Sequence, residues 1–486
     1  MKILTTLAIG ILGAGASLAS LAAVEVGEVT FARGVVTGQI DGEPPRIIAK
    51  GVGLHNGETL NTGSRAFALI ELKDGTKMTL RPSTTFKIEN VDIREGSENA
   101  LLSLFRGGFR ALTGFISKNT PNAFRINTTV ATIGIRGTEF DARLCEGVEC
   151  QAEEDASGET AQRETRVVGR IALLRGKASA TEDDRQSRVL NLGAAVYERD
   201  QIQTGIKSFA VIAFNDSTRV TVSPQSAFRI EEHEYKPDQP DENNSFLSFL
   251  QGGLRLVTGA IGRLNRKAFR VATPTATIGI RGTGFDLVCQ GTCISGSALR
   301  DPAGDTLLGK LLKFFLRPAY AQSADNGMYA KVWNGSIELQ LANNNTVLLQ
   351  NGRTAFLRNG FSQPQLVPDI PPLLRNFQGA PRPDRVEVQQ DLFSESAMAA
   401  IEPGLYVKVD DGDVSVRGVD GNTIHVGKGE AVHAGRARAV RLGFVPAFQK
   451  FDTTPRPGQM SAQSEKMMNL FGERGAGKES MECTVQ

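Results

Sequence analysis

The sequence has few aromatic and few sulfur-containing side chains, and it lacks any block of like charges. Of its 486 residues, one is Trp, five are Tyr and five are Cys. The formal net charge is +2, and basic and acidic residues are interspersed. Without a basic cluster, the chain lacks the electrostatic footprint of a protein that binds nucleic acid or an anionic membrane.

Long apolar runs are also missing, apart from one at the N-terminus. Residues 1–23 combine Lys2, an apolar stretch and the small residues Ala22 and Ala23, as secretory signal peptides do. We therefore expect cleavage near Ala22 or Ala23 and localisation to the periplasm or outside the cell. A transmembrane anchor is the alternative, although basic stop-transfer residues do not follow. No other run is long and apolar enough to span a bilayer.

Motifs for catalysis or metal binding are missing as well. The four histidines form no pair at metal-ligand spacing and accompany no nucleophile motif. We interpret them as solvated loop residues; they are His55, His233, His425 and His433. The sequence thus predicts no catalytic residue, no metal and no cofactor. Carboxylate pairs distant in sequence, as glycosidases use, leave an enzyme as an alternative.

Two segments only approximate a ligand-binding motif. Residues 410–413 cluster three Asp around a Gly, but at an expected hairpin turn, where these residues are common, so we do not predict a calcium loop. Residues 472–479 nearly spell a phosphate-binding loop. However, Glu479 stands where Ser or Thr would bind magnesium, and no buried strand precedes it.

The most informative feature that is present is a verbatim internal repeat. Ala-Thr-Ile-Gly-Ile-Arg-Gly-Thr occupies residues 131–138 and again residues 276–283. In both copies one further residue separates this octapeptide from Phe-Asp. Such identity indicates a duplicated module. We place the first module at residues 24–150 and the second at residues 165–293.

Both modules show the period of two that is typical of β-strands. In the first, Ala68, Ile70 and Leu72 alternate with other residues, and the second repeats this pattern. Turn-forming pairs such as Asp74-Gly75 separate these runs. Paired glycines at 107–108 and 252–253 predict a bulge or a sharp bend. The sequence therefore predicts an all-β fold, either a sandwich or a solenoid-like body.

The remaining segments follow the modules in order. A weaker repeat relates residues 328–339 to residues 405–416, each read as strand, turn and strand. The cationic segment 307–317 predicts a short amphipathic helix, which either packs on the sheet or contacts a membrane surface or a partner. The expected boundaries are an insert at 294–325, trailing β-hairpins at 326–363, a Pro-rich linker at 364–400, C-terminal β-hairpins at 401–448 and a flexible tail at 449–486.

A pair of cysteines follows each copy of the repeat at the same place. Cys145 and Cys150 follow the first copy, and Cys289 and Cys293 follow the second. In an exported protein such pairs predict two small disulfide-closed loops. A four-thiolate zinc site is the alternative. Cys483 is left over.

The repeated segment itself is the main candidate site. The glycine after each Arg is expected to adopt a backbone bend that other residues avoid. An ion pair between that Arg and the following Asp would hold the bend, which favours a structural corner; an Arg that faces a ligand is the alternative. The residues concerned are Arg136, Gly137, Thr138, Phe140 and Asp141, and in the second copy Arg281, Gly282, Thr283, Phe285 and Asp286.

The second module closely resembles the FecR domain. Residues 199–205 read Arg-Asp-Gln-Ile-Gln-Thr-Gly, and residues 273–285 read Thr-Pro-Thr-Ala-Thr-Ile-Gly-Ile-Arg-Gly-Thr-Gly-Phe, close to the full pattern of that family. The first module departs from the pattern at Gly57-Glu58 and at Thr129-Val130, where Pro is missing.

The resemblance implies an all-β domain outside the cytoplasm that binds partners and performs no chemistry. In the sensor branch it relays the state of an outer-membrane receptor to a sigma factor, but we see no cytoplasmic helical domain here and expect a stand-alone exported protein. The expected function is binding or sensing of an envelope protein, such as an outer-membrane receptor, or of an envelope glycan. Alternatives are an assembly protein that uses strand edges and a wall-acting enzyme.

Overall fold

The computed structural model describes most of the chain between residues 24 and 457. The described residues are 24–120, 123–146, 148–157, 166–183, 187–290, 326–341, 345–359, 363–371, 374, 379–389, 392–396, 398 and 400–457. The expected signal peptide, the amphipathic helix, Cys293, Cys483 and residues 472–479 lie outside them. Within these ranges no helix is both long and apolar enough to cross a membrane.

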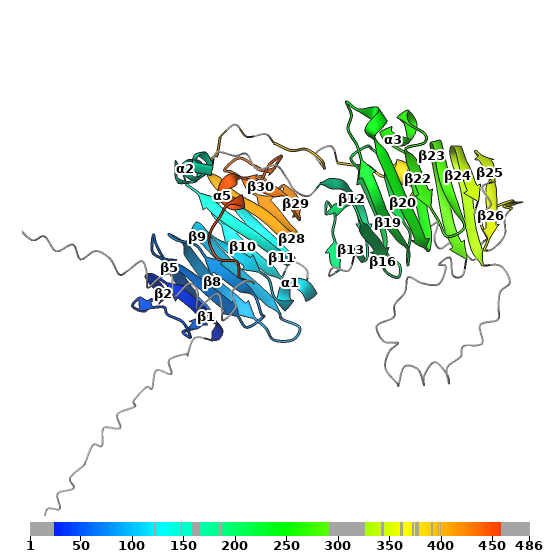
Figure 1. The fold of residues 1–486 in the computed structure, drawn as a ribbon. Coiled ribbons are helices and arrows are strands. Elements are labelled where there is room, and N and C mark those ends of the chain that lie inside the picture. Colours follow the sequence, from blue (N-terminus) through cyan, green and yellow to red (C-terminus); the bar gives the residue numbers. More distant parts are fainter. Residues whose placement is uncertain are drawn as a thin grey trace, which may run out of the picture.

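The predicted all-β class is confirmed, because the described chain forms two curled sheets and only short helices (Figure 1). The helices are α1 (Phe115–Asn119), α2 (Val148–Ser157), α3 (Ala260–Leu264) and α5 (Ala447–Lys450), with 3₁₀ turns η1 (Pro240–Glu242) and η3 (Pro383–Arg385). Each sheet curls around its own apolar core, and each contains one copy of the repeat. We refer to these two bodies as module 1 and module 2.

Module 1 contains a 15-stranded sheet. Its strands are β1 (Glu25–Arg33), β2 (Val36–Ile40), β3 (Arg46–Ile47), β4 (Gly53–His55), β5 (Glu58–Thr62), β6 (Phe67–Leu72), β7 (Lys77–Leu80), β8 (Thr85–Asp92), β9 (Asn99–Leu112), β10 (Phe124–Thr128), β11 (Ala131–Cys145), β28 (Gly404–Gly418), β29 (Thr423–Gly427), β30 (Ala431–Ala434) and β31 (Ala439–Leu442). The ring of Phe109 packs edge-on against that of Phe140 in the core, with centroids 5.7 Å apart. Such contacts between aromatic rings add to the burial of apolar area.

Module 2 contains a 16-stranded sheet. Its strands are β12 (Val167–Arg175), β13 (Ala178–Glu182), β14 (Arg188–Leu190), β15 (Ala195–Tyr197), β16 (Asp200–Thr204), β17 (Phe209–Phe214), β18 (Arg219–Val222), β19 (Ala227–Glu234), β20 (Asn244–Gln251), β21 (Gly253–Val257), β22 (Phe269–Ala272), β23 (Ala276–Gln290), β24 (Gly327–Leu341), β25 (Thr346–Gln350), β26 (Thr354–Arg358) and β27 (Gln365–Val367). All of its strands follow one another in sequence.

The paired glycines produce the predicted bend. Gly107 has φ 78°, and Gly252 has φ 82°, which only glycine adopts easily. Before Gly107 strand β9 pairs with β8 and β10, whereas after it β9 pairs with β7 and β11. The bend therefore lets one strand contribute to two parts of the curled sheet. In module 2 the same bend separates β20 from β21.

The late strands join different modules, which the sequence did not predict. Strand β24 pairs along β23 of module 2, but β28 pairs along β11 of module 1, so that Gly404 lies opposite Cys145. Residues 401–448 are therefore part of module 1 and not a separate set of hairpins. Each of β24 and β28 is also a single strand with a bulge, at Gly335 and Gly412, rather than two strands joined by a turn.

The Pro-rich segment lies against module 2. Residues 365–367 form β27, which pairs with β26, so part of the expected linker is a strand. Further on, the side chain of Arg382 stacks on the ring of Trp333 at 3.7 Å from its centroid. These contacts hold the segment on the sheet surface before the chain returns to module 1.

Candidate functional site between the modules

Both copies of the repeat form a bend in a long strand, as predicted. Gly137 has φ 58° and Gly282 has φ 66°, and the pairing register shifts directly after each of them. In module 1 the bend is held by two hydrogen bonds between Thr113 and Thr138. The amide of Thr113 donates to the carbonyl of Thr138, and the amide of Thr138 donates to the hydroxyl of Thr113. The repeat therefore has a structural role in both modules. The side chains of Arg281 and Thr283 lie outside the described part of the chain.

The expected Arg–Asp ion pair within the repeat is wrong for module 1. The carboxylate of Asp141 contacts the side chains of Arg110, at 3.1 Å, and of Lys408, at 3.5 Å. These residues lie directly opposite Asp141 on β9 and β28. Cross-strand neighbours are closer than residues five positions apart along one strand, so they take the carboxylate instead of Arg136.

Module 2 repeats this arrangement around Asp286. Its carboxylate contacts Arg255 at 3.1 Å and accepts a hydrogen bond of 2.9 Å from the indole N–H of Trp333. Burial raises the pKa of both Asp141 and Asp286, and the neighbouring cations oppose that rise. The aspartate of each repeat thus organises a buried polar cluster on the outer face of its sheet.

Arg136, in contrast, faces the other module. Its guanidinium hydrogen-bonds to the side chain of Asn191, which follows β14 of module 2, and it lies opposite Asp413 of β28. Burial lowers the pKa of Arg136, and Asp413 opposes this shift. Arg136 therefore contributes to the contact between the modules.

Two adjoining cavities of about 170 and 250 Å³ lie at this contact, and both are lined by Arg136 and Asp413. Three buried polar atoms around them have no hydrogen-bond partner, namely Nε of Arg136, Oδ1 of Asp413 and Nδ1 of His425. Lys118, Arg188 and Lys428 also line the cavity of about 170 Å³. Buried groups of this kind are normally satisfied by a protein group, a water molecule or a ligand.

The modules are held together by a buried ionic cluster near these cavities. Glu430, between β29 and β30, contacts Arg170 of β12 and, at 3.4 Å, Arg441 of β31. Burial would raise the pKa of Glu430, but the two guanidinium groups outweigh it and lower the pKa. Tyr197 also donates to the carbonyl of Lys428 at 2.9 Å. The module 1 residues of this cluster, Lys428, Glu430 and Arg441, all lie in the segment from β29 to β31. This segment therefore fixes the position of module 2 relative to module 1.

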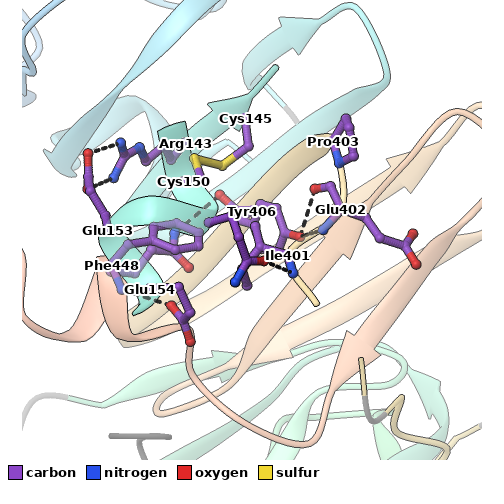
Figure 2. Close-up of a disulfide and its surroundings, with 12 residues drawn as sticks. Arg143, Cys145, Cys150, Glu153, Glu154, Ile401, Glu402, Pro403, Tyr406 and Phe448 are labelled. Atoms are coloured by element: carbon purple, nitrogen blue, oxygen red, sulfur yellow. Dashed lines mark hydrogen bonds and ion pairs between the residues drawn. A yellow bond between two sulfur atoms is a disulfide. The ribbon is translucent and has the colours of Figure 1, made fainter. Parts of the chain in front are cut away.

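The disulfide between Cys145 and Cys150 closes the loop after the first repeat, with 5.9 Å between Cα atoms (Figure 2). It anchors α2, which packs on α5: Glu154 accepts a 3.1 Å hydrogen bond from the amide of Phe448. Figure 2 shows Phe448 and Tyr406 beside this loop, with their rings edge to face at 5.3 Å. Cys289 is also disulfide-bonded.

The interpretation of the four histidines as solvated loop residues is wrong, because all of them lie in strands: His55 in β4, His233 in β19, His425 in β29 and His433 in β30. His233 is buried between Ser245 and Asn215, and burial lowers its pKa to about 4. His433 is buried in β30, where a ring nitrogen lies 3.2 Å from the carbonyl of Pro403. The alternation of strands β19 and β30 could have indicated this. Within the described ranges, no three His, Cys, Asp or Glu side chains gather closely enough to hold a metal ion.

The sequence pointed to Arg136 but not to the residues around it. Asn191 and Asp413 belong to no binding motif. Asp413 lies opposite Arg136 because β28 returns to module 1, and Asn191 of module 2 hydrogen-bonds to Arg136 across the contact. The cavity of about 250 Å³ is lined by a cation, a carboxylate and an imidazole, from Arg136, Asp413 and His425. Chemically, it suits a polar group that carries both a negative charge and a hydrogen-bond donor.

The fold is that of a two-module all-β protein. Residues 58–156 and 200–297 match the FecR protein family model, so the chain contains two tandem FecR domains, as predicted. The matches support a role in sensing or signal transduction. Strands β24–β31 lie outside both matched regions.

Other comparisons reach less of the chain. Two crystal structures of a candidate anti-sigma factor from Parabacteroides distasonis are similar at 14% and 12% identity, with TM-scores of 0.23 and 0.22. Both alignments cover 34% of this chain and 58% of that one, so the chain spans little more than half of that protein. A comparison with curated proteins finds no match.

Proposed function

We propose that the chain is an exported, non-enzymatic sensory protein that binds a cell-envelope partner at the contact between its two FecR domains. The partner is an envelope protein, such as an outer-membrane receptor, or an envelope glycan. A charged or hydroxylated group of that partner would enter the cavity between the modules. Since residues of both modules line the cavity, binding there would alter how the modules sit relative to each other.

One observation carries this proposal. The two repeats share eight residues, yet the arginine of the first copy lies at a cavity where its own Nε, Oδ1 of Asp413 and Nδ1 of His425 all lack a hydrogen-bond partner. A group that supplies an acceptor to Arg136 and a donor to Asp413 would satisfy two of these atoms at once. Such charge-assisted hydrogen bonds are stronger than neutral ones.

Photo-crosslinking in the native host tests the proposal. A photoreactive amino acid at Val189, which lines the cavity and is 37% exposed, should capture a discrete envelope species. Arg136→Ala should reduce that capture at least ~10-fold while each module stays folded, because it removes a charge-assisted contact. Arg281→Ala, the same change in the second repeat, is the matched control and should leave capture unchanged.

Three results would contradict this function. The same species could be captured equally from Leu348, which is 49% exposed on β25 at the far end of module 2 (Figure 1). Arg136→Ala could leave capture intact. Cell fractionation could find the full-length chain in the cytoplasm with residues 1–23 retained, which would contradict export.

Assembly through strand edges is the second candidate, and it is favoured by two exposed edge strands. Among the strands that the structure describes, β3 pairs only with β2, and β27 pairs only with β26. Ile47 and Leu366 on these strands are 70% and 65% exposed. Exposed apolar edges are templates for pairing with another chain. Assembly predicts light scattering that rises with concentration and falls in an Ile47→Lys, Leu366→Lys variant, whereas the sensory function predicts a monomer.

A further inference from the structure

A segment of the chain around η3, residues 380–386, crosses the outer face of module 2. Strands β18, β21, β23 and β24 form this face. The side chain of Arg255 donates to the carbonyl of Ala380 at 2.9 Å, and the hydroxyl of Thr221 donates to that of Pro381 at 3.0 Å. Arg219 donates to the carbonyl of Val386 at 3.0 Å. The face thus recognises main-chain carbonyls, which carry no sequence information.

The equivalent face of module 1 carries the residues that follow α5. Arg110 donates to the carbonyl of Thr454 at 2.5 Å. The carboxylate of Asp452 lies between Arg81, with which it forms an ion pair, and Arg110, at 3.4 Å. In Figure 1 the red segment after α5 runs over the strands of module 1. Here the face recognises a carboxylate as well as a carbonyl.

The two faces are equivalent residue by residue. Thr79 pairs with Arg110 across β7 and β9, as Thr221 pairs with Arg255 across β18 and β21. Each arginine is in turn opposite the aspartate of its repeat, Asp141 or Asp286. The buried aspartate therefore holds the arginine in the position from which it donates to the docked segment.

The module 1 face is less completely used by its own segment. Thr221 donates to the segment on module 2, but the hydroxyl of Thr79 is 0% exposed and has no hydrogen-bond partner. Lys77, which stands where module 2 has Arg219, forms an ion pair with Glu71, at 3.5 Å. An unsatisfied buried hydroxyl is unfavourable, so a segment that also reached Thr79 would bind better than the present one.

Module 1 also has a cation that module 2 lacks at this place. Arg81 precedes Pro82 as Ser223 precedes Pro224. Burial, together with the charge of Arg143, lowers the pKa of Arg81 to about 10. A cluster of partly buried guanidinium groups is stabilised by an incoming carboxylate.

We propose that the outer face of module 1, formed by Thr79, Arg81 and Arg110, is a docking groove for an extended acidic segment of a protein partner. Residues 452–456 of this chain occupy it in cis. The partner segment carries Asp or Glu two residues before the carbonyl that Arg110 binds, as Asp452 precedes Thr454. It displaces residues 452–456 and additionally uses Thr79. This groove is separate from the cavity at Arg136 and does not depend on the function proposed for that cavity.

Binding of a labelled peptide tests the groove. The probe is a fluorescein-labelled peptide with the sequence of residues 450–457, and fluorescence anisotropy with the full-length chain is the readout. Asp452→Ala weakens the cis contact, so this variant should bind the peptide at least ~10-fold more tightly than the unaltered chain, in which the tethered segment competes at high effective concentration. A peptide with Asn in place of the aspartate should bind Asp452→Ala at least ~10-fold more weakly.

A second variant tests whether Arg81 recognises the carboxylate of the peptide. It leaves Arg110 unchanged, because the fold of module 1 depends on that residue. Adding Arg81→Gln to Asp452→Ala should abolish the preference for the Asp peptide over the Asn peptide. Equal binding of the peptide to the unaltered chain and to Asp452→Ala would overturn the proposal. So would dimerisation of Asp452→Ala by exchange of tails, detected by light scattering, because the occupant would then be a second copy.

Discussion

The two modules are built from equivalent strands, yet only one of them is continuous in sequence. Module 2 runs from β12 to β27, and β24 covers the strand that carries its repeat. Module 1 obtains the equivalent strand, β28, from beyond module 2. Module 2 is therefore inserted into module 1 between β11 and β28. The two modules therefore have similar folds, but module 2 is complete within one continuous stretch of sequence, whereas module 1 is complete only when the strands that follow module 2 have joined it.

The insertion also explains where the contacts between the modules lie. Glu430 and Asp413 both belong to the part of module 1 that is completed last. The docked residues 452–456 follow immediately. The C-terminal part of the chain thus closes module 1, fixes module 2 and covers the outer face of β9.

The largest expected effect is the unfolding of one module at a time by matched substitutions in the two cores. Val409 lies opposite Phe140 and Val332 lies opposite Phe285, and all four are buried. A buried unpaired carboxylate destabilises by more than ~4 kcal/mol. Val409→Asp should remove hydrogen-exchange protection from β1–β11 while β12–β27 stay protected, and Val332→Asp should do the reverse. Loss of protection in both modules from either change would contradict their independence.

The next effect concerns the contact between the modules. Glu430→Gln leaves the buried guanidinium groups of Arg170 and Arg441 without their carboxylate, a change that typically costs ~3–5 kcal/mol. We expect the radius of gyration in solution scattering to increase while each core stays folded. Lys428→Ala removes an ion pair with Glu182 nearer the surface, worth at most ~1 kcal/mol, and is the control. Equal separation of the modules in both variants would refute the role of Glu430.

A third effect distinguishes the modules by pH. His233 of module 2 has a pKa of about 4, whereas the equivalent residue of module 1 is Val91. In the unfolded state this histidine takes up a proton near pH 6.5, whereas in the folded state it does so only near pH 4. The free energy of unfolding of module 2 is therefore unaffected above pH 6.5 and decreases as the pH falls from 6.5 toward 4, by a total on the order of 3 kcal/mol. The hydrogen-exchange protection factors of module 2, corrected for the intrinsic slowing of exchange at low pH, should therefore fall before those of module 1 on acidification.

His233→Val, which copies module 1, supplies the control for this pH effect. The variant loses hydrogen bonds to Ser245 and Asn215, so its baseline stability falls, and only the slope against pH is informative. In this variant, the free energy of unfolding of module 2 should change with pH between 6.5 and 4.5 only as much as that of module 1 does. An unchanged slope would assign the acid sensitivity to another group.

The smallest effect concerns the disulfide of module 1. A loop as short as that between Cys145 and Cys150 stabilises by roughly 2 kcal/mol in the chain-entropy model. Replacing both cysteines by Ser should loosen α2 and, through Glu154 and Phe448, also α5, as faster hydrogen exchange. Cys289→Ser should leave α5 unaffected. If α5 exchanged equally fast in both variants, the disulfide would not be what anchors it.

Features that depend on neighbouring residues could be predicted from the sequence. The repeat identified the FecR domains, the period of two gave the β class, and Gly137 marked the bend. Features that depend on distant residues could not. The partners of Asp141 lie 31 positions before it and 267 positions after it, on β9 and β28. The similarity of residues 328–339 to 405–416 showed that two strands were related, but not which sheet each would join.

By itself, the sequence determined the duplicated module, its strand class and the corner at each repeat, because glycine geometry and residue alternation act over a few positions. Only the tertiary structure decided that the last strands close the first module and that Arg136 faces the second. Strand pairing joins segments of any separation, and the entropy cost of bringing the two ends of the intervening chain together rises only slowly with its length. A chain can therefore leave one domain, complete another and return, and local patterns do not record that path.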